Sequence, residues 1–179
     1  MIESHTSLQD RLTPVVQIIR DAGGKIVGRT KLQKTVYLLT LAGFEKRFRF
    51  GYRHYGPFSE ELAEAAELAA AFGHILERQE PASWGGTYSV YIASDGEISV
   101  QAQGGRVRLT REAAHSDAVL LELAATAAYL AQESKPQPWA EAARRKPDKA
   151  GNGRLEEAKG LYALLRRASG DSLPAIAGS

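Results

Sequence analysis

The sequence of 179 residues contains no cysteine. This absence excludes disulfide bridges, thiolate zinc sites and a cysteine nucleophile. It is typical of proteins in a reducing compartment, so we expect a cytoplasmic location. The first residues, MIESHTSLQD, are polar, and we expect no secretory signal. No apolar run approaches the ~18 residues that a membrane-spanning helix needs, so we expect no membrane contact.

Motifs that carry catalysis are also scarce. A serine nucleophile elbow of the form G-x-S-x-G is absent. The four histidines do not pair at a spacing used by metal sites. They are His5, His54, His74 and His115. We therefore expect no catalytic residue, no metal and no cofactor.

One stretch, GGKIVGRT at residues 23–30, approaches a phosphate-binding loop, but Arg29 stands where such a loop has lysine. Arginine is a poor substitute for that compact charge. A nucleotide-binding fold also needs an alternating series of strands and helices, which does not follow. We interpret the stretch as the end of one helix and the start of another. An enzyme that binds nucleotides is kept as the weakest of three hypotheses.

Charge is low in total, at +2, but it is unevenly distributed. Residues 25–54 contain eight basic side chains and one acidic one, a net +7, whereas residues 58–80 contain one basic and six acidic, a net −5. Neighbouring segments of opposite charge indicate that electrostatics matters to contacts within or between molecules.

Apolar residues at spacings of three and four predict helices in the first part of the chain. These helices cover 8–22, 31–42 and 58–72. We expect the first to begin near Thr13, because Pro14 is tolerated in a first turn only. Thr30 and Gln33 have the spacing of a capping box for the second. Ser59 is the predicted N-cap of the third.

Alternating residues predict strands between and after these helices. The predicted strands are 47–53, then a hairpin of 74–80 with 87–93, and a second hairpin of 97–102 with 106–110. In the rest of the chain we expect helices at 117–133, 139–146 and 155–167.

This order predicts an α+β protein that is mostly α: a winged-helix-like core of three helices with a short strand and a β-hairpin wing, plus a C-terminal helical extension. We expect the winged-helix-like domain to cover 8–93. An extra hairpin and the C-terminal helices, 94–169, would pack on it. Residues 170–179 are expected to be a disordered tail.

The third predicted helix bears on function, because its exposed face is acidic and residues 58–73 contain no base. Helices that enter the DNA major groove use Arg, Lys, Asn or Gln, so we do not expect this helix to read DNA. An acidic helix beside a basic segment suits a protein partner, or a second copy of the chain. The predicted partner-binding residues are Glu60, Glu61, Glu64 and Glu67, with His54 and Tyr55 at the preceding turn.

An alternative hypothesis is a transcriptional regulator that binds nucleic acid through the basic segment 25–53. Its side chains would meet phosphates without reading sequence. The residues of this alternative are Arg29, Lys31, Lys34, Arg47, Arg49 and Arg53.

Two stretches, GRTKLQKTVYLL and FRFGYRHYGPFSEEL, resemble the YwgA-like proteins of bacteria and archaea. In that family a Gly-Arg-x-Lys-Leu-Gln-Lys start of a helix is followed by a Tyr-Gly-Pro-[Phe/Tyr]-Ser-Glu-Glu-Leu joint. The same features look more remotely similar to Panacea (SocA-like) antitoxin domains. The resemblance implies a winged-helix-related fold and a regulatory or defence role such as toxin neutralisation. We therefore expect a non-enzymatic regulatory or adaptor protein, antitoxin-like in type.

Overall fold

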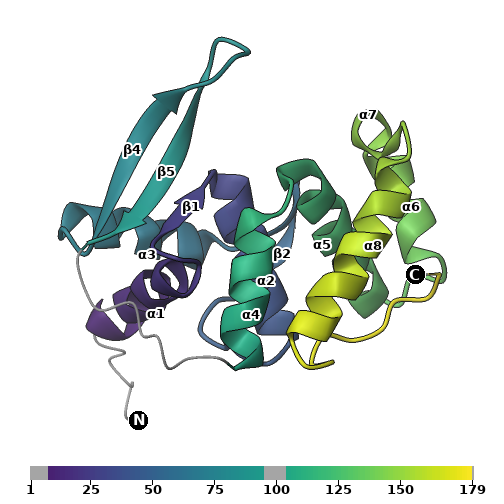
Figure 1. Cartoon of the computed structure of the whole chain (residues 1–179), viewed down its shortest axis with the longest axis horizontal. Coiled ribbons are helices and arrows are strands. Elements are labelled where there is room, and N and C mark those ends of the chain that lie inside the picture. The colour runs from purple at the N-terminus through teal and green to yellow at the C-terminus, as the bar shows by residue number, and fades with distance from the viewer. Residues whose placement is uncertain (1–7, 95–103, 179) are drawn as a thin grey trace.

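The computed structural model of the protein describes residues 8–94 and 104–178. The first part of the chain combines helices with short strands (Figure 1). Its elements are α1 (Leu8–Asp21), β1 (Lys25–Val27), α2 (Arg29–Leu41), β2 (Gly51–Arg53), β3 (Gly56–Phe58), α3 (Glu60–Ala71), β4 (Ile75–Pro81) and β5 (Thr87–Ala93). The regular elements described in the second part are all helices: α4 (Gly105–His115), α5 (Ala118–Gln132), α6 (Pro138–Arg145), α7 (Pro147–Ala150) and α8 (Arg154–Ala168). The predicted class, α+β and mostly α, is confirmed.

The larger sheet has three antiparallel strands in the order β1–β5–β4. Strands β4 and β5 pair from Ile75 with Ala93 to Pro81 with Thr87, which confirms the predicted hairpin. Strand β1 was not predicted, and it covers only the part of β5 from Val90 to Ile92. Strand β5 therefore continues beyond the end of β1, and the tip of the hairpin projects away from the helices (Figure 1).

A separate two-stranded ribbon, β2 with β3, lies between α2 and α3 in the chain. We expected one strand over 47–53, but regular pairing begins only at Gly51. Side chains satisfy the preceding backbone: Glu45 accepts the N–H groups of Lys46 and Arg47, at 2.8 and 2.9 Å. Glu61 accepts the N–H of Arg49 at 2.9 Å. These donors have side-chain acceptors in place of a neighbouring strand.

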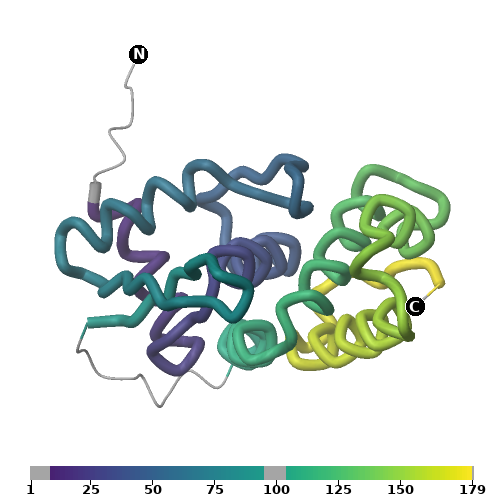
Figure 2. Tube along the Cα trace, turned by 90° about the horizontal axis from the view of Figure 1, so that it is seen from above, coloured from purple at the N-terminus to yellow at the C-terminus, as the bar shows by residue number. Residues whose placement is uncertain are grey.

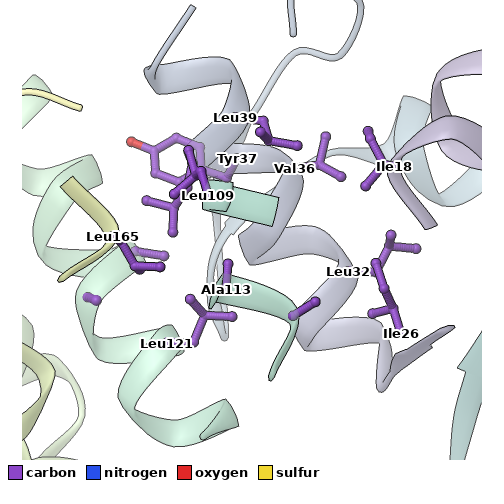
Figure 3. Close-up of a cluster of buried hydrophobic side chains, with 14 of the residues drawn as sticks. Ile18, Ile26, Leu32, Val36, Tyr37, Leu39, Leu109, Ala113, Leu121 and Leu165 are labelled. Atoms are coloured by element: carbon purple, nitrogen blue, oxygen red, sulfur yellow. The ribbon is translucent and has the colours of Figure 1, made fainter. Parts of the chain in front are cut away.

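Helix α2 is the centre of the molecule, and every residue from Leu32 to Leu39 is buried. It packs against α4 and α5, and its side chains join one continuous apolar core (Figure 3). That core includes Ile18 of α1 as well as Leu165 of α8. The C-terminal helices therefore complete the same core as the first three helices. Figure 2 shows them beside the N-terminal part in a second view.

Helix α1 begins at Leu8, earlier than expected, and contains Pro14 in its interior. Thr13 does not cap it. Its hydroxyl donates instead to the carbonyl of Gln9, at 2.8 Å.

The second predicted hairpin is wrong where it can be checked. Residues 97–102 lie outside the described residues, but 106–110 belong to α4. Val107, Thr110 and Ala114 are buried at spacings of three and four, which is a helical face. Gly105 is needed for close packing rather than for a turn, because a Cβ there would lie 2.6 Å from the Ser169 carbonyl oxygen.

The tail, expected to be disordered, packs on α8 over the residues that the structure describes. Leu173 and Ile176 are buried. The Tyr162 hydroxyl donates to the carbonyl of Pro174 at 2.7 Å. These contacts hold the chain end against the helix it follows.

The start of β3 comes unusually close to α5. Gly56 has φ of 89°, and a Cβ at this position would lie 2.5 Å from the Thr126 hydroxyl oxygen. Both the backbone conformation and the packing therefore require glycine.

We predict that Gly56→Ala lowers the free energy of unfolding by about 2 kcal/mol more than Gly43→Ala does. Gly43 is a matched control: its φ is 80° and nothing lies within 4 Å of the added Cβ. Urea unfolding measures both variants. Equal losses would show that the contact with Thr126 carries no cost.

Candidate functional site

The two stretches singled out in the sequence contact each other through Gln33. Its side-chain amide donates to the carbonyl of Ser59 and accepts the N–H of Ser59, both at 2.9 Å. Both residues are buried. The predicted capping box of Thr30 and Gln33 is wrong, because the N-cap of α2 is Gly28, which has no side chain to accept a hydrogen bond. Gln33 is directed to Ser59 instead.

Ser59 itself begins α3, as predicted. Its hydroxyl accepts the N–H of Leu62 at 3.2 Å. The residue is thus fixed by Gln33 on its backbone and by the first turn of α3 on its side chain. One buried glutamine sets where the third helix starts relative to the second.

Lys34, the next residue of α2, is 1% exposed. Its ammonium donates to the carbonyl of Pro57 at 2.8 Å. Burial lowers the pKa of Lys34 to about 7; Glu122 opposes the shift, and Lys146 and Lys149 add to it. The side chain thus holds the turn before α3, at the cost of burying an amine.

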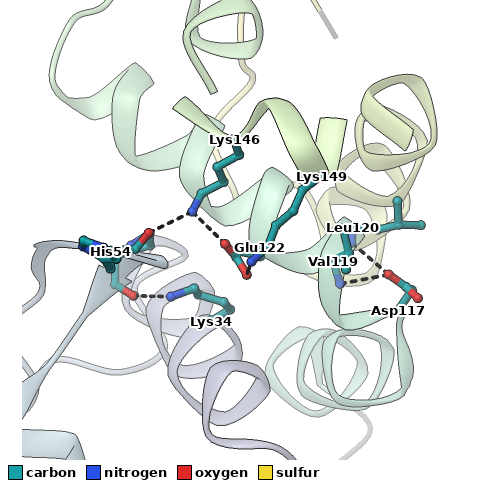
Figure 4. Close-up of polar contacts among 9 residues, drawn as sticks. Lys34, His54, Asp117, Val119, Leu120, Glu122, Lys146 and Lys149 are labelled. Carbon is teal, nitrogen blue, oxygen red and sulfur yellow. Dashed lines mark hydrogen bonds and ion pairs between the residues drawn. The ribbon is translucent and has the colours of Figure 1, made fainter. Parts of the chain in front are cut away.

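A buried carboxylate lies beside this lysine (Figure 4). Glu122 of α5 accepts from Lys146 and from Lys149, each at 2.6 Å. Lys146, between α6 and α7, also donates to the carbonyl of His54 at 3.3 Å. The group of Lys34, Glu122, Lys146 and Lys149, here called the lysine cluster, therefore bonds the β2–β3 turn at two carbonyls, one on each side of Tyr55.

Tyr55 is exposed at this turn, at 58%. The ammonium of Lys149 lies 5.0 Å from the centroid of its ring, within reach of a cation–π contact. His54 is exposed as well, and its ring packs edge-on against that of Tyr55. The lysine cluster thus fixes the backbone of this turn, while the rings of His54 and Tyr55 remain exposed to solvent.

Tyr55 borders a groove of about 980 Å³, here called the hairpin groove. The other wall is the β4–β5 hairpin, including Trp84 in its loop, which is 77% exposed. The groove is lined by Val27, Gly28, Arg29, Thr30, Lys31, Tyr55, Gln79, Trp84, Thr87, Tyr88, Ser89 and Ala118. Its charged lining residues are both basic, and they come from the first turn of α2.

The acidic face predicted on α3 exists, but half of it is paired within the chain. Arg53 lies 2.8 Å from Glu60, and Arg49 lies 3.3 Å from Glu61. Glu64 and Glu67 are exposed further along the helix. The basic and acidic segments recognised in the sequence therefore partly neutralise each other across the joint.

Most basic residues of the nucleic-acid alternative are paired with glutamates, and one is buried. Lys34 was expected to meet phosphates, and this is wrong, because it is buried. Arg47 lies 3.7 Å from Glu45 and Arg29 lies 3.5 Å from Glu77. Only Arg29 and Lys31 of the predicted set reach the hairpin groove.

Sequence reasoning missed the lysine cluster and Trp84. Glu122 is the single charged residue in AVLLELAATAAYL, and a lone acid within an apolar helix indicates a buried ionic contact. Trp84 lies in the predicted hairpin loop, where an exposed large ring is unusual. Both signals were available.

The described residues hold no group of three histidine or acidic side chains placed to bind a metal ion. None of the helices within 8–94 and 104–178 has the length and apolar character needed to cross a bilayer.

Comparison with known proteins gives one informative similarity. No family model matches the chain. Eighty residues are 31% identical to the uncharacterized protein YwgA of Bacillus subtilis (strain 168), covering 45% of this chain and 43% of that protein. The match thus spans less than half of the relative's length. It supports similarity to an uncharacterised YwgA-like group, as the two sequence stretches indicated.

We predict that Gln33→Leu lowers the free energy of unfolding by about 3 kcal/mol, because it leaves the buried N–H of Ser59 without a partner and removes one of the two donors to its C=O, the other being the N–H of Ala63. Gln79→Leu is the control: Gln79 donates to Ser89 Oγ from the exposed hairpin, so its loss should stay near 0.5 kcal/mol. Urea unfolding compares the two. A loss below about 1 kcal/mol for Gln33→Leu would remove this contact from the account.

Lys34 predicts a pH dependence of stability. Its folded pKa is about 7, below the unfolded value, so the folded chain binds fewer protons than the unfolded chain between about pH 7 and pH 10. Stability should therefore rise with pH in that range, relative to Lys34→Met, which does not titrate there. Thermal unfolding from pH 6 to 9.5 measures the difference. A difference that is flat or falls with pH would contradict the lowered pKa of the buried Lys34.

Proposed function

We propose that this protein is a non-enzymatic regulatory or adaptor protein of winged-helix type that acts by binding another protein in the hairpin groove. The supporting observation is the pair of exposed rings, Trp84 and Tyr55, which both line that groove. Tryptophan and tyrosine dominate the energetics of protein interfaces, because they bury a large area with little loss of conformational freedom.

Four other rings of the chain, those of Tyr37, Tyr91, Trp139 and Tyr162, are buried. Phe72 is exposed, but it does not line the groove. Tyr55 is held by the lysine cluster at the carbonyls of His54 and Pro57, so its exposure comes from an ordered turn. A ring fixed before binding loses less entropy when a partner covers it.

The lining favours binding over catalysis. Among the described residues that form it, hydroxyl groups stand beside Arg29 and Lys31, without a histidine or carboxylate to act as a general base. The resemblance to YwgA-like proteins, and more remotely to Panacea antitoxin domains, adds the proposal that the bound protein is neutralised or delivered, as by an antitoxin.

The acidic face of α3 remains a second proposed contact within the same function. Because Glu60 and Glu61 pair with Arg53 and Arg49, the part free to attract a basic partner is Glu64 and Glu67. The groove and this face are distinguishable by mutation.

We predict that Trp84→Ser with Tyr55→Ser reduces partner recovery by about tenfold or more, as expected for the loss of two interface rings. Proteins cross-linked to the chain in its native host would be quantified by mass spectrometry. Phe72→Ser with Leu164→Ser is the control, because both residues are exposed apolar side chains that do not line the hairpin groove.

Loss of the partner with Glu64→Lys and Glu67→Lys, but not with the ring variant, would move the contact to α3. Equal recovery with all variants, or no partner at all, would defeat the proposal.

A further inference from the structure

We propose that the hairpin groove takes an extended peptide with alternating apolar and acidic residues, laid beside the end of β5 that β1 does not cover. This inference rests on the proposed function and specifies the chemistry of the partner.

The sheet provides the first argument. Strand β5 is paired with β4 along its whole length, but its other edge is paired with β1 only from Val90 to Ile92. The last bond on that side runs from Gly28 N–H to the carbonyl of Ser89, at 2.8 Å, because the chain then enters α2. Thr87 and Tyr88 lie beyond it and line the groove. An extended segment placed there continues the line of β1, the arrangement by which peptides add to sheet edges.

Charge provides the second argument. Arg29 and Lys31 line the groove, and no acid does so among the described residues. Both belong to the first turn of α2, whose N-cap, Gly28, supplies no side-chain acceptor, so the positive end of the helix dipole adds to their charge. Arg29 is exposed, and its contact with Glu77 is long, at 3.5 Å, so this pair can exchange for a partner's carboxylate.

The neighbourhood of these bases favours a peptide over a nucleic acid. Glu77 lies next to Arg29, and Asp117 acts on Lys31 closely enough to oppose the lowering of its pKa by burial. Two bases with two nearby acids suit one or two carboxylates. A nucleic acid brings a negative charge with every nucleotide and would be repelled by those acids.

The two exposed rings, Trp84 and Tyr55, indicate how the side chains of the bound peptide should alternate. Side chains of an extended segment alternate between two faces, so residues i and i+2 share one of them. Trp84 and Tyr55 can cover apolar side chains, while the intervening residues carry carboxylates to Arg29 and Lys31. An alternating apolar and acidic pattern satisfies both sets.

The test uses the full chain and a displayed library of random heptapeptides. We expect enrichment of peptides that alternate apolar residues with Asp or Glu. Synthetic copies should protect Trp84 from acrylamide quenching; Trp139, 3% exposed, contributes a constant background. Arg29→Glu with Lys31→Glu should weaken binding about tenfold or more. The control, Lys46→Glu with Arg154→Glu, reverses two exposed bases that do not line the groove and should leave binding unchanged.

Several outcomes would overturn the inference: no enrichment, enriched peptides without acidic residues, or binding that survives the reversal of Arg29 and Lys31. Protection of Trp84 by a 15-nucleotide oligothymidylate in place of peptides would assign the groove to nucleic acid. Non-acidic peptides whose binding is lost in Trp84→Ser with Tyr55→Ser would defeat this inference and leave the proposed function standing. Failure of every peptide, together with unchanged partner recovery in that ring variant, would defeat both.

Discussion

The structure depends on the hydrogen bonds that two neighbouring residues of α2 make to the turn before α3. Gln33 takes both backbone groups of Ser59, and Lys34 takes the carbonyl of Pro57. Buried polar groups left unpaired cost more than most single contacts contribute, so these bonds fix the position of the turn against the central helix. The beginning of α3, the ribbon of β2 and β3, and the exposure of Tyr55 all follow from that position.

The same turn connects the two parts of the chain. Lys146, from the junction of α6 and α7, reaches the carbonyl of His54, while Gly56 packs against Thr126 of α5. The C-terminal helices are thus part of the site as well as of the core. A change at the Glu122 carboxylate would reach Tyr55 through two lysines and one backbone segment. The two stretches that resemble YwgA-like proteins therefore have a structural explanation. The proposed contact with a partner is made by Trp84 and Tyr55.

Local patterns predicted local structure well. The hairpin of β4 and β5, the Ser59 cap and the apolar face of α3 follow from alternation, capping chemistry and helical period. Predictions failed where a residue distant in the sequence determines the local structure. Gln33 forms no capping box because Ser59 competes for its amide, and Lys34 is buried because Pro57 and the lysine cluster surround it. The segment 106–110 is helical because it packs against α2 and α8, and Gly105 permits the close approach to Ser169. The charged segments were identified correctly, but their pairing across the joint is a property of the fold.

Hydrogen exchange at the amide of Ser59 tests the central claim most directly. If Gln33 binds this amide inside the fold, its exchange should require global unfolding, and its protection should match that of the core of α2. Protection near that of an unstructured peptide, in a chain whose α2 amides remain protected, would contradict the account.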